Sequence, residues 1–292
     1  MQLSSFLERL ALHKLKSIGG RSEWLEVHGA QIHQISLPSL RSGAGSAPPL
    51  LLVHGLGSNA GSYGKLIKYA HPHFKRVVAP SAPAHGMSPP HDSVKDPEAL
   101  FRLWATVLDR HTAQEPAILL GTSLGGAIAI RYALERPERV QGLALCSPAG
   151  PQMTLEEIQE VQGHFRMDRL NDGARFLERL FHQTPPWSAL LGLAVRATLG
   201  GELIQGFLRD LTPKTGLSPA ELSALSVPTL LVWGQSERIL PRGIFERYQT
   251  CIPSELLTIL EPEGFGHSPQ LERPRELLQA LLNWRSSLEP HP

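Results

Sequence analysis

The sequence predicts an α/β fold in which a mostly parallel, eight-stranded sheet is flanked by helices and carries a helical insertion after its sixth strand. Short, wholly apolar segments alternate with amphipathic helical patterns along most of the 292 residues, which is typical of an α/β domain. Strands without polar positions are buried on both faces, as they are in a parallel sheet. One interval, residues 150–225, contains helical patterns only and marks the insertion.

Two antiparallel strands are expected first, at residues 22–28 and 30–36, because polar and apolar residues alternate there on either side of Gly29. Six apolar segments give the remaining strands, at residues 49–53, 76–79, 117–120, 140–145, 229–233 and 255–260. Amphipathic patterns predict helices between them at residues 96–110, 124–135, 241–251 and 274–288.

The first residues are expected to form a short helix that docks on the body. Their apolar side chains recur at helical spacing, at Leu3, Phe6, Leu7 and Leu10. Lys14 and Lys16 leave a second possibility open, in which residues 1–16 contact a membrane surface. Glu8 and Arg9 interrupt the apolar pattern, so the segment makes a poor signal peptide.

The helical insertion contains two clear helix-start signals. Thr154 and Ser218 are each followed three residues later by a glutamate, which is the pattern of a capping box. We therefore divide the chain into a first part of the core at residues 1–149, a helical cap at residues 150–225 and a second part of the core at residues 226–292.

Composition and charge argue against several classes of protein. The formal net charge of +1 disfavours a general nucleic-acid binder, which needs a basic excess to neutralise phosphates. No apolar run approaches the ~20 residues that a transmembrane helix requires. Cys146 and Cys251 cannot form a disulfide framework, so a reducing, cytoplasmic location is expected.

A Gly-x-Ser-x-Gly motif at residues 121–125 is the strongest signal for chemistry. It follows the apolar segment 117–120 and leads into the helix at 124–135, so Ser123 is expected on a sharp strand-to-helix turn. That turn presents the serine oxygen at the carboxyl edge of the sheet. It also places the backbone N–H of Leu124 at a helix N-terminus, ready to receive an oxyanion.

Two later residues can activate this serine. A serine hydroxyl is a weak nucleophile without a base, and His267 lies in a glycine-flanked loop after the last strand. Glu237 follows the preceding strand directly, and the carboxyl ends of parallel strands lie at one edge of the sheet. The order Ser123, Glu237, His267 therefore predicts a catalytic triad, with Glu237 orienting the imidazole.

These residues resemble the capped serine hydrolases of the α/β-hydrolase superfamily. Three blocks carry the resemblance: His-Gly-x-Gly at residues 54–57, Trp-Gly-x-x-acid at residues 233–237, and Gly-His-x-Pro-x-x-Glu-x-Pro at residues 266–274. The resemblance implies an α/β-hydrolase fold with a cap. It also implies that the N–H of Leu56 is the second oxyanion donor beside that of Leu124.

Two departures from the family pattern stand out. Glu237 stands where the family usually has an aspartate, and its side chain is one methylene longer. The family's Asp-x-Pro-Gly-His-Gly-x-Ser loop has Ser81 and Ala84 here in place of its acid and its first glycine. Because that loop lies beside the oxyanion strand, the local bracing of the site is expected to be less secure.

The expected function is hydrolysis of a carboxylic ester of a small to medium hydrophobic substrate through an acyl-enzyme intermediate, with no cofactor and no metal. The same triad serves carbon–carbon-bond hydrolases of ring-fission products, so that activity stays open. A non-hydrolytic ligand-binding or acyl-transferring relative also stays open. The expected partner is a small hydrophobic molecule, bound beside the cap, and not a nucleic acid.

Overall fold

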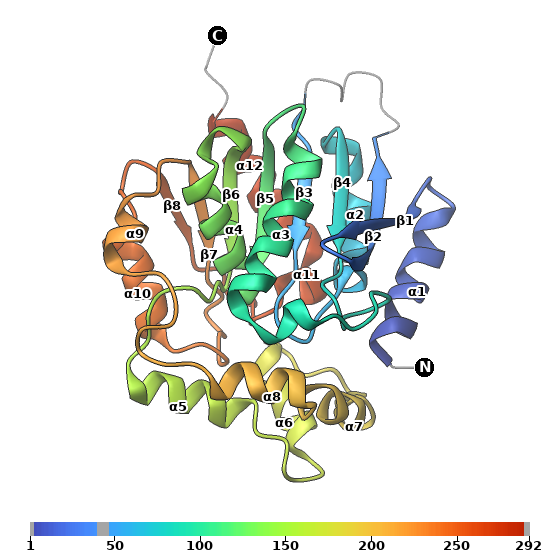
Figure 1. Ribbon diagram of the computed structural model, residues 1–292, viewed down its shortest axis with the longest axis vertical. Helices are drawn as coiled ribbons and strands as arrows, with labels where there is room; N and C mark the ends of the chain where they lie inside the picture. Colours follow the sequence, from blue (N-terminus) through green and yellow to red (C-terminus); the bar gives the residue numbers. More distant parts are fainter. Residues whose placement is uncertain (1–2, 40–46, 289–292) are drawn as a thin grey trace.

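The computed structural model describes residues 3–39 and 47–288, and its centre is an eight-stranded sheet in the order β1-β2-β4-β3-β5-β6-β7-β8 (Figure 1). β1 and β2 form an antiparallel hairpin, β2 pairs antiparallel with β4, and the other pairs are parallel. This confirms the predicted sheet. Its strands are β1 Arg21–Val27, β2 Ala30–Pro38, β3 Leu50–Val53, β4 Arg76–Pro80, β5 Ala117–Thr122, β6 Val140–Cys146, β7 Thr229–Val232 and β8 Leu257–Leu260.

Helices cover both faces of the sheet. α3, α4 and α10 share a buried core with Leu51 and Leu119, whereas α1, α2 and α12 share another with Leu50 and Ile118. Adjacent residues of one strand thus enter different cores, which explains why the central strands are apolar throughout. The body helices are α1 Leu3–Lys16, α2 Gly64–Ala70, α3 Pro97–Thr112, α4 Leu124–Glu135, α10 Arg242–Cys251, α11 Pro269–Glu272 and α12 Pro274–Leu288, with 3-10 turns η2 Ala60–Tyr63, η3 His71–His73, η4 Asp92–Lys95 and η5 Pro137–Arg139.

The N-terminal helix α1 docks on the body, but not through the face expected from the sequence. Leu12 and Leu15 are buried and Glu8 is fully enclosed. The expected inward residues that the structure describes are exposed, namely Phe6, Leu7 and Leu10, and the side chain of Leu3 lies outside the described part. The expected face was therefore wrong, because the carboxylate of Glu8 finds hydrogen-bond donors inside the body. In the described ranges, no helix is both long and apolar enough to cross a membrane.

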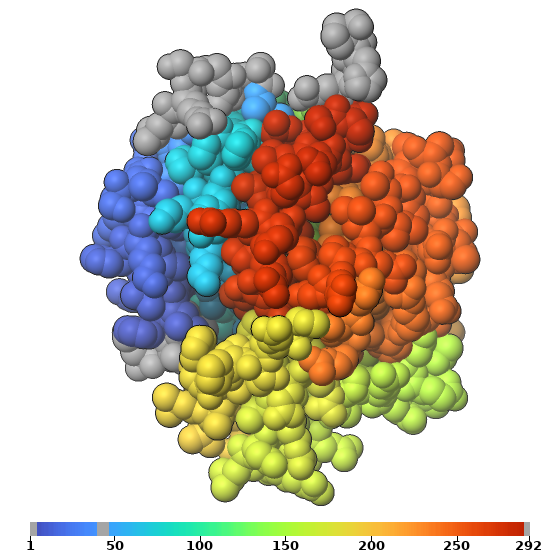
Figure 2. All heavy atoms as spheres, turned by 180° about the vertical axis from the view of Figure 1, so that it is seen from behind, coloured from blue at the N-terminus to red at the C-terminus, as the bar shows by residue number. Residues whose placement is uncertain are grey.

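Four helices of the insertion lie across the carboxyl ends of the strands and form the lower end of the molecule (Figures 1 and 2). They are α5 Leu155–His164, α6 Asp172–Leu180, α7 Ser188–Leu199 and α8 Glu202–Arg209. A fifth helix, α9 Pro219–Ser223, packs beside α10 on the body. Both predicted capping boxes are present, with Thr154 at the start of α5 and Ser218 at the start of α9.

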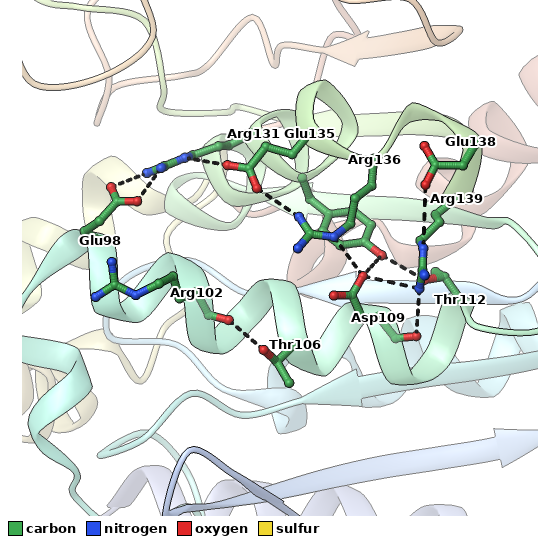
Figure 3. Close-up of polar contacts among 11 residues, drawn as sticks. Glu98, Arg102, Thr106, Asp109, Thr112, Arg131, Glu135, Arg136, Glu138 and Arg139 are labelled. Atoms are coloured by element: carbon green, nitrogen blue, oxygen red, sulfur yellow. Dashed lines mark hydrogen bonds and ion pairs between the residues drawn. The ribbon is translucent and has the colours of Figure 1, made fainter.

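Helix α4, which starts directly after Ser123, is tied to α3 by ion pairs on the surface (Figure 3). The Arg131 guanidinium contacts both carboxylate oxygens of Glu98, one of them at 2.7 Å, and Arg136 Nε lies 3.0 Å from Asp109 Oδ1. Exposed pairs of this kind contribute about 0–1 kcal/mol each. As a group they connect the C-terminal half of α4 and the residue that follows it to α3.

Candidate active site

Ser123 occupies a strained turn between β5 and α4. Its backbone has φ 53° and ψ −124°, and a positive φ is unusual for a residue with a side chain. The chain can turn this tightly because glycines allow close approach. A Cβ on Gly125 would lie 2.0 Å from the Val53 carbonyl oxygen, and one on Gly121 would lie 2.5 Å from the Gly125 carbonyl oxygen. The turn predicted from the Gly-x-Ser-x-Gly motif is therefore present.

His267 and Glu237 form a buried pair. His267 Nδ1 lies 2.8 Å from Glu237 Oε2, and both side chains are almost inaccessible to solvent. The other carboxylate oxygen of Glu237 accepts hydrogen bonds from the backbone N–H of Ile239 at 2.7 Å and Leu240 at 3.0 Å. Burial alone would raise the pKa of Glu237, but the charge and hydrogen bond of His267 outweigh it, so the pKa lies below its usual value. Glu237 is thus held as a carboxylate beside the imidazole.

The sheet brings Ser123 to the same edge as this pair. Ser123 N–H donates to the Cys146 carbonyl oxygen at the end of β6 (3.2 Å), and Ser147 N–H donates to the Val232 carbonyl oxygen at the end of β7 (2.9 Å). Three neighbouring strands therefore end side by side. Among the described residues, no hydrogen bond joins the Ser123 hydroxyl to the imidazole of His267. Nucleophile–base contacts of this kind often tighten only when substrate is bound.

The loop of His267 is fastened to the inserted helices through Glu272. One Glu272 oxygen accepts from Gly266 N–H at 3.0 Å, and the other accepts from His182 N–H, just beyond α6, at 2.6 Å. His267 N–H donates to the Leu180 carbonyl oxygen at 3.0 Å. The sequence block at residues 266–274 contained Glu272, but its bracing role depends on the fold and was not foreseen.

Leu56 and Leu124, expected to supply the oxyanion donors, line one pocket. Two histidines hold the loop that carries Leu56. His54 Nε2 accepts from Ala82 N–H at 2.9 Å, and His85 Nε2 accepts from Gly57 N–H at 3.2 Å. Both rings must keep that nitrogen unprotonated, and each has its other nitrogen 2.8–2.9 Å from a backbone carbonyl oxygen. This role of His85 was not predicted from the sequence.

Burial keeps these histidines neutral. Burial, together with the neighbouring His85, lowers the pKa of His54 from 6.5 to about 3. Burial also lowers the pKa of His85. A third histidine, His111, lies on α3 with its Nε2 2.8 Å from Gln34 Oε1, and burial together with the charge of Arg76 lowers its pKa to about 4.

The free energy of unfolding is expected to fall as the pH drops from about 6.5 to 5. A histidine whose pKa is depressed by folding stabilises the protein fully above its unfolded pKa, and that stability is lost as the pH falls toward the folded pKa. Each such histidine contributes a slope of about 1.4 kcal/mol per pH unit. Chemical denaturation across this range measures the slope. His111→Gln should reduce the slope by about 1.4 kcal/mol per pH unit, the contribution of one histidine. An unchanged slope would contradict the lowered pKa of His111.

The pocket beside Leu56 and Leu124 is narrow and apolar. It measures about 20 Å³ and is lined, besides those two residues, by Val94, Leu100, Trp104, Ile128, Leu203 and Phe207. A wider groove of about 340 Å³ adjoins it between the loops at residues 57–58 and 84–85 and helices α7 and α8. Leu203 of α8 and His85 line both, so these two side chains lie where the narrow pocket meets the groove.

Other polar groups in the described residues offer no metal site, since no three His, Cys, Asp or Glu side chains gather there as ligands. Ala84, which stands where the family pattern has a glycine, adopts φ 62°, in the left-handed region that favours glycine. This conformation costs a residue with a Cβ roughly 1–2 kcal/mol. Ser81 is fully buried, and its hydroxyl accepts from Ala60 N–H at 2.9 Å.

Known proteins are similar to this chain in sequence, and solved structures are similar to it in fold. Human monoacylglycerol lipase ABHD6 is 24% identical over 276 residues, covering 86% of this chain and 79% of that protein. The pimeloyl-[acyl-carrier protein] methyl ester esterase of Xanthomonas campestris is 29% identical over 258 residues, covering 84% and 97%. The crystal structure of carboxylesterase CesB from Bacillus subtilis superimposes with a TM-score of 0.75 at 20% identity, covering 97% and 99%.

The sequence profile of the alpha/beta hydrolase family matches residues 50–280, which include the turn at Ser123 and the loops of Glu237 and His267. The match spans most of the chain, and the order and direction of the strands agree with it. The chain therefore belongs to the alpha/beta hydrolase family.

Proposed function

We propose that this protein is a serine hydrolase that cleaves a carboxylic ester of a small to medium hydrophobic substrate. One observation carries the proposal: a serine on a strained strand-to-helix turn shares a sheet edge with a buried imidazole–carboxylate pair at 2.8 Å. The pair leaves Nε2 of His267 free to act as a base, because Nδ1 is directed to Glu237. Relatives named as esterases and lipases support the same class of reaction.

In the first half of the reaction, Ser123 Oγ attacks the ester carbonyl carbon and its proton passes to His267 Nε2. The backbone N–H groups of Leu56 and Leu124 stabilise the oxyanion, and Glu237 stabilises the imidazolium. The C–O bond to the alcohol then breaks, and the alcohol leaves with the proton from Nε2. An acyl group remains on Ser123.

In the second half, water attacks the acyl carbon and gives its proton to His267. The second tetrahedral intermediate uses the same two N–H donors. Its collapse releases the carboxylic acid and returns the proton to Ser123. Every bond formed to Ser123 is thus broken again, and the reaction consumes only ester and water.

The lining of the narrow pocket suits an uncharged group. Its walls are leucine, valine, isoleucine, phenylalanine and tryptophan side chains, with two histidines whose pKa values are lowered by burial. We propose that residues 150–225 act as a cap, in which α8 closes the pocket through Leu203 and Phe207 while α9 connects back to the body.

Labelling with a fluorophosphonate tests the proposed nucleophile. Wild-type protein should be labelled on Ser123, and Ser123→Ala should not be labelled. Ser22 is a demanding control, because its hydroxyl lies 2.8 Å from His33 Nε2 and His33 Nδ1 lies 2.6 Å from Glu8 Oε1, which imitates a triad on ordinary strand backbone. Ser22→Ala should label like wild type. Label on Ser22, or none on folded wild type, would refute the proposal.

Leu203→Ala is expected to shift the preferred p-nitrophenyl ester toward longer acyl chains. The substitution shortens one of the two side chains that line both the narrow pocket and the groove, so the passage between them should widen. The ratio of kcat/KM for the octanoate to that for the acetate should rise about tenfold. This corresponds to the burial of about two further CH₂ groups, each of which contributes about 0.8 kcal/mol. Leu193→Ala, at an exposed position on α7, is the matched control. An unchanged ratio in Leu203→Ala would place the acyl site elsewhere.

A further inference from the structure

Glu8 is a residue of α1 whose carboxylate is buried in the body of the protein. Its side chain is fully enclosed, and a buried carboxylate needs hydrogen-bond donors to offset its lost hydration. Oε1 lies 2.6 Å from His33 Nδ1 and accepts from the Ser81 hydroxyl at 2.9 Å. Oε2 accepts from Met87 N–H at 2.7 Å. The carboxylate therefore has three donors, one on strand β2 and two in the loop at residues 81–88.

Two of these donors belong to the loop at residues 81–88, the loop in which the family's acid is replaced by Ser81. The carboxylate bridges the two ends of this loop, from Ser81 to Met87. It also fills the space beside Gly86, where a Cβ would lie 1.6 Å from Glu8 Oε2. A carboxylate is thus bound to this loop after all, but it belongs to helix α1, near the start of the sequence.

The same loop holds the strand end that carries the proposed oxyanion donor. Ala82 N–H donates to His54 at 2.9 Å, and the His85 ring accepts from Gly57 N–H at 3.2 Å. A shift of the loop at residues 81–88 would therefore move the backbone on both sides of Leu56. Displacements of about 1 Å at a reacting centre can lower a rate about 100-fold.

We propose that Glu8 is a positioning residue for the oxyanion site. From a distant part of the same chain, it supplies the carboxylate that the loop lacks at Ser81. This inference rests on the proposed serine-hydrolase function. Glu8 orders the loop at residues 81–88, and the loop orders the Leu56 N–H through His54 and His85. Helix α1 then holds Glu8 in place, which explains why Glu8 points inward while Phe6, Leu7 and Leu10 point outward.

Four variants test this with ester kinetics: Glu8→Gln, Ser81→Asp, Glu8→Ala combined with Ser81→Asp, and Arg9→Gln. Glu8→Gln keeps the shape and replaces one acceptor oxygen by an amide group. Its kcat should fall about 10- to 100-fold with KM changed little, because oxyanion donors act on the transition state. Arg9→Gln removes an exposed charge from the same helix and should behave like wild type.

The double variant moves the carboxylate from α1 to the loop and should recover most of the lost kcat. Ser81→Asp alone places a second carboxylate beside that of Glu8, and the repulsion between them should lower kcat. The same Ser81→Asp substitution should therefore lower kcat when Glu8 is present and raise it when Glu8 is absent. Each kcat is divided by the concentration of Ser123 labelled to completion with fluorophosphonate, which removes any contribution from unfolded protein. Affinity for an alkyl boronic acid, an oxyanion mimic, should fall in parallel with kcat.

Two outcomes would overturn the inference: a Glu8→Gln variant with the kcat and boronic acid affinity of Arg9→Gln, or a double variant without recovery although its Ser123 is labelled. A lower melting temperature with unchanged kcat per labelled site would mean that Glu8 only anchors α1. Wild-type protein that takes no label at Ser123 would instead reject the proposed function itself, so the two failures are distinguishable.

Discussion

Ser123→Ala is expected to lower kcat/KM for p-nitrophenyl esters by roughly 10⁴- to 10⁶-fold, the range for loss of the nucleophile in a triad. The residual rate would come from the oxyanion donors and from substrate binding alone. Because alanine keeps the Cβ at φ 53°, the fold and the melting temperature should change little. Steady-state kinetics with circular dichroism on the same preparation measure both.

Ser123→Gly separates the strain at this residue from its chemistry. It should be as inactive as Ser123→Ala, yet its free energy of unfolding should rise by about 1 kcal/mol, because glycine adopts a positive φ without steric cost. Strain of this kind is often stored at functional sites. If Ser123→Ala kept more than a few per cent of the wild-type rate, the nucleophile would have to be another residue.

Glu237→Gln is expected to lower kcat by roughly 10³- to 10⁴-fold while the fold remains intact. The amide oxygen can still accept from the N–H groups of Ile239 and Leu240, which turns the NH₂ group toward His267. Nδ1 must then accept a hydrogen bond, so the proton sits on Nε2. In that tautomer the imidazole cannot take the proton of Ser123.

Glu237→Asp is the matched comparison, because it keeps the charge and shortens the side chain by one methylene. We expect a loss of roughly 10- to 100-fold, intermediate between wild type and Glu237→Gln, since the carboxylate no longer reaches both His267 and the N–H pair. Pre-steady-state acylation measured by the p-nitrophenol burst reports this step directly. Equal losses in Asp and Gln variants would mean that length, rather than charge, controls the role of Glu237.

The local features of this fold could be predicted from the sequence. The alternating pattern predicted β1 and β2, and the apolar segments predicted the other six strands. The helices predicted at 124–135 and 274–288 agree with α4 and α12. The predicted capping boxes at Thr154 and Ser218 also formed. Each of these features depends on residues within a few positions of one another, so the spacing of those residues predicts the local structure directly. Helix α2, at Gly64–Ala70, is too short to leave such a pattern.

The candidate site divides in the same way. The sequence indicated Ser123, Glu237 and His267 because each follows a strand in a glycine-rich turn, and the parallel sheet gathers strand ends at one edge. It could not indicate Glu8, whose hydrogen bond to Met87 spans 79 residues. The apolar spacing of α1 even suggested the opposite face, since hydrophobic periodicity takes no account of buried donors elsewhere in the fold.

The sequence by itself thus determined the strands, the order of the proposed triad and the turn that strains Ser123, because these follow from neighbouring residues and the repeat of each element. Only the tertiary structure decided which carboxylate serves the loop at residues 81–88, how His54 and His85 hold the chain around Leu56, and how Leu203 narrows the pocket. Those contacts join segments distant in sequence, and a buried polar group takes whichever partner the packed fold places within hydrogen-bond distance.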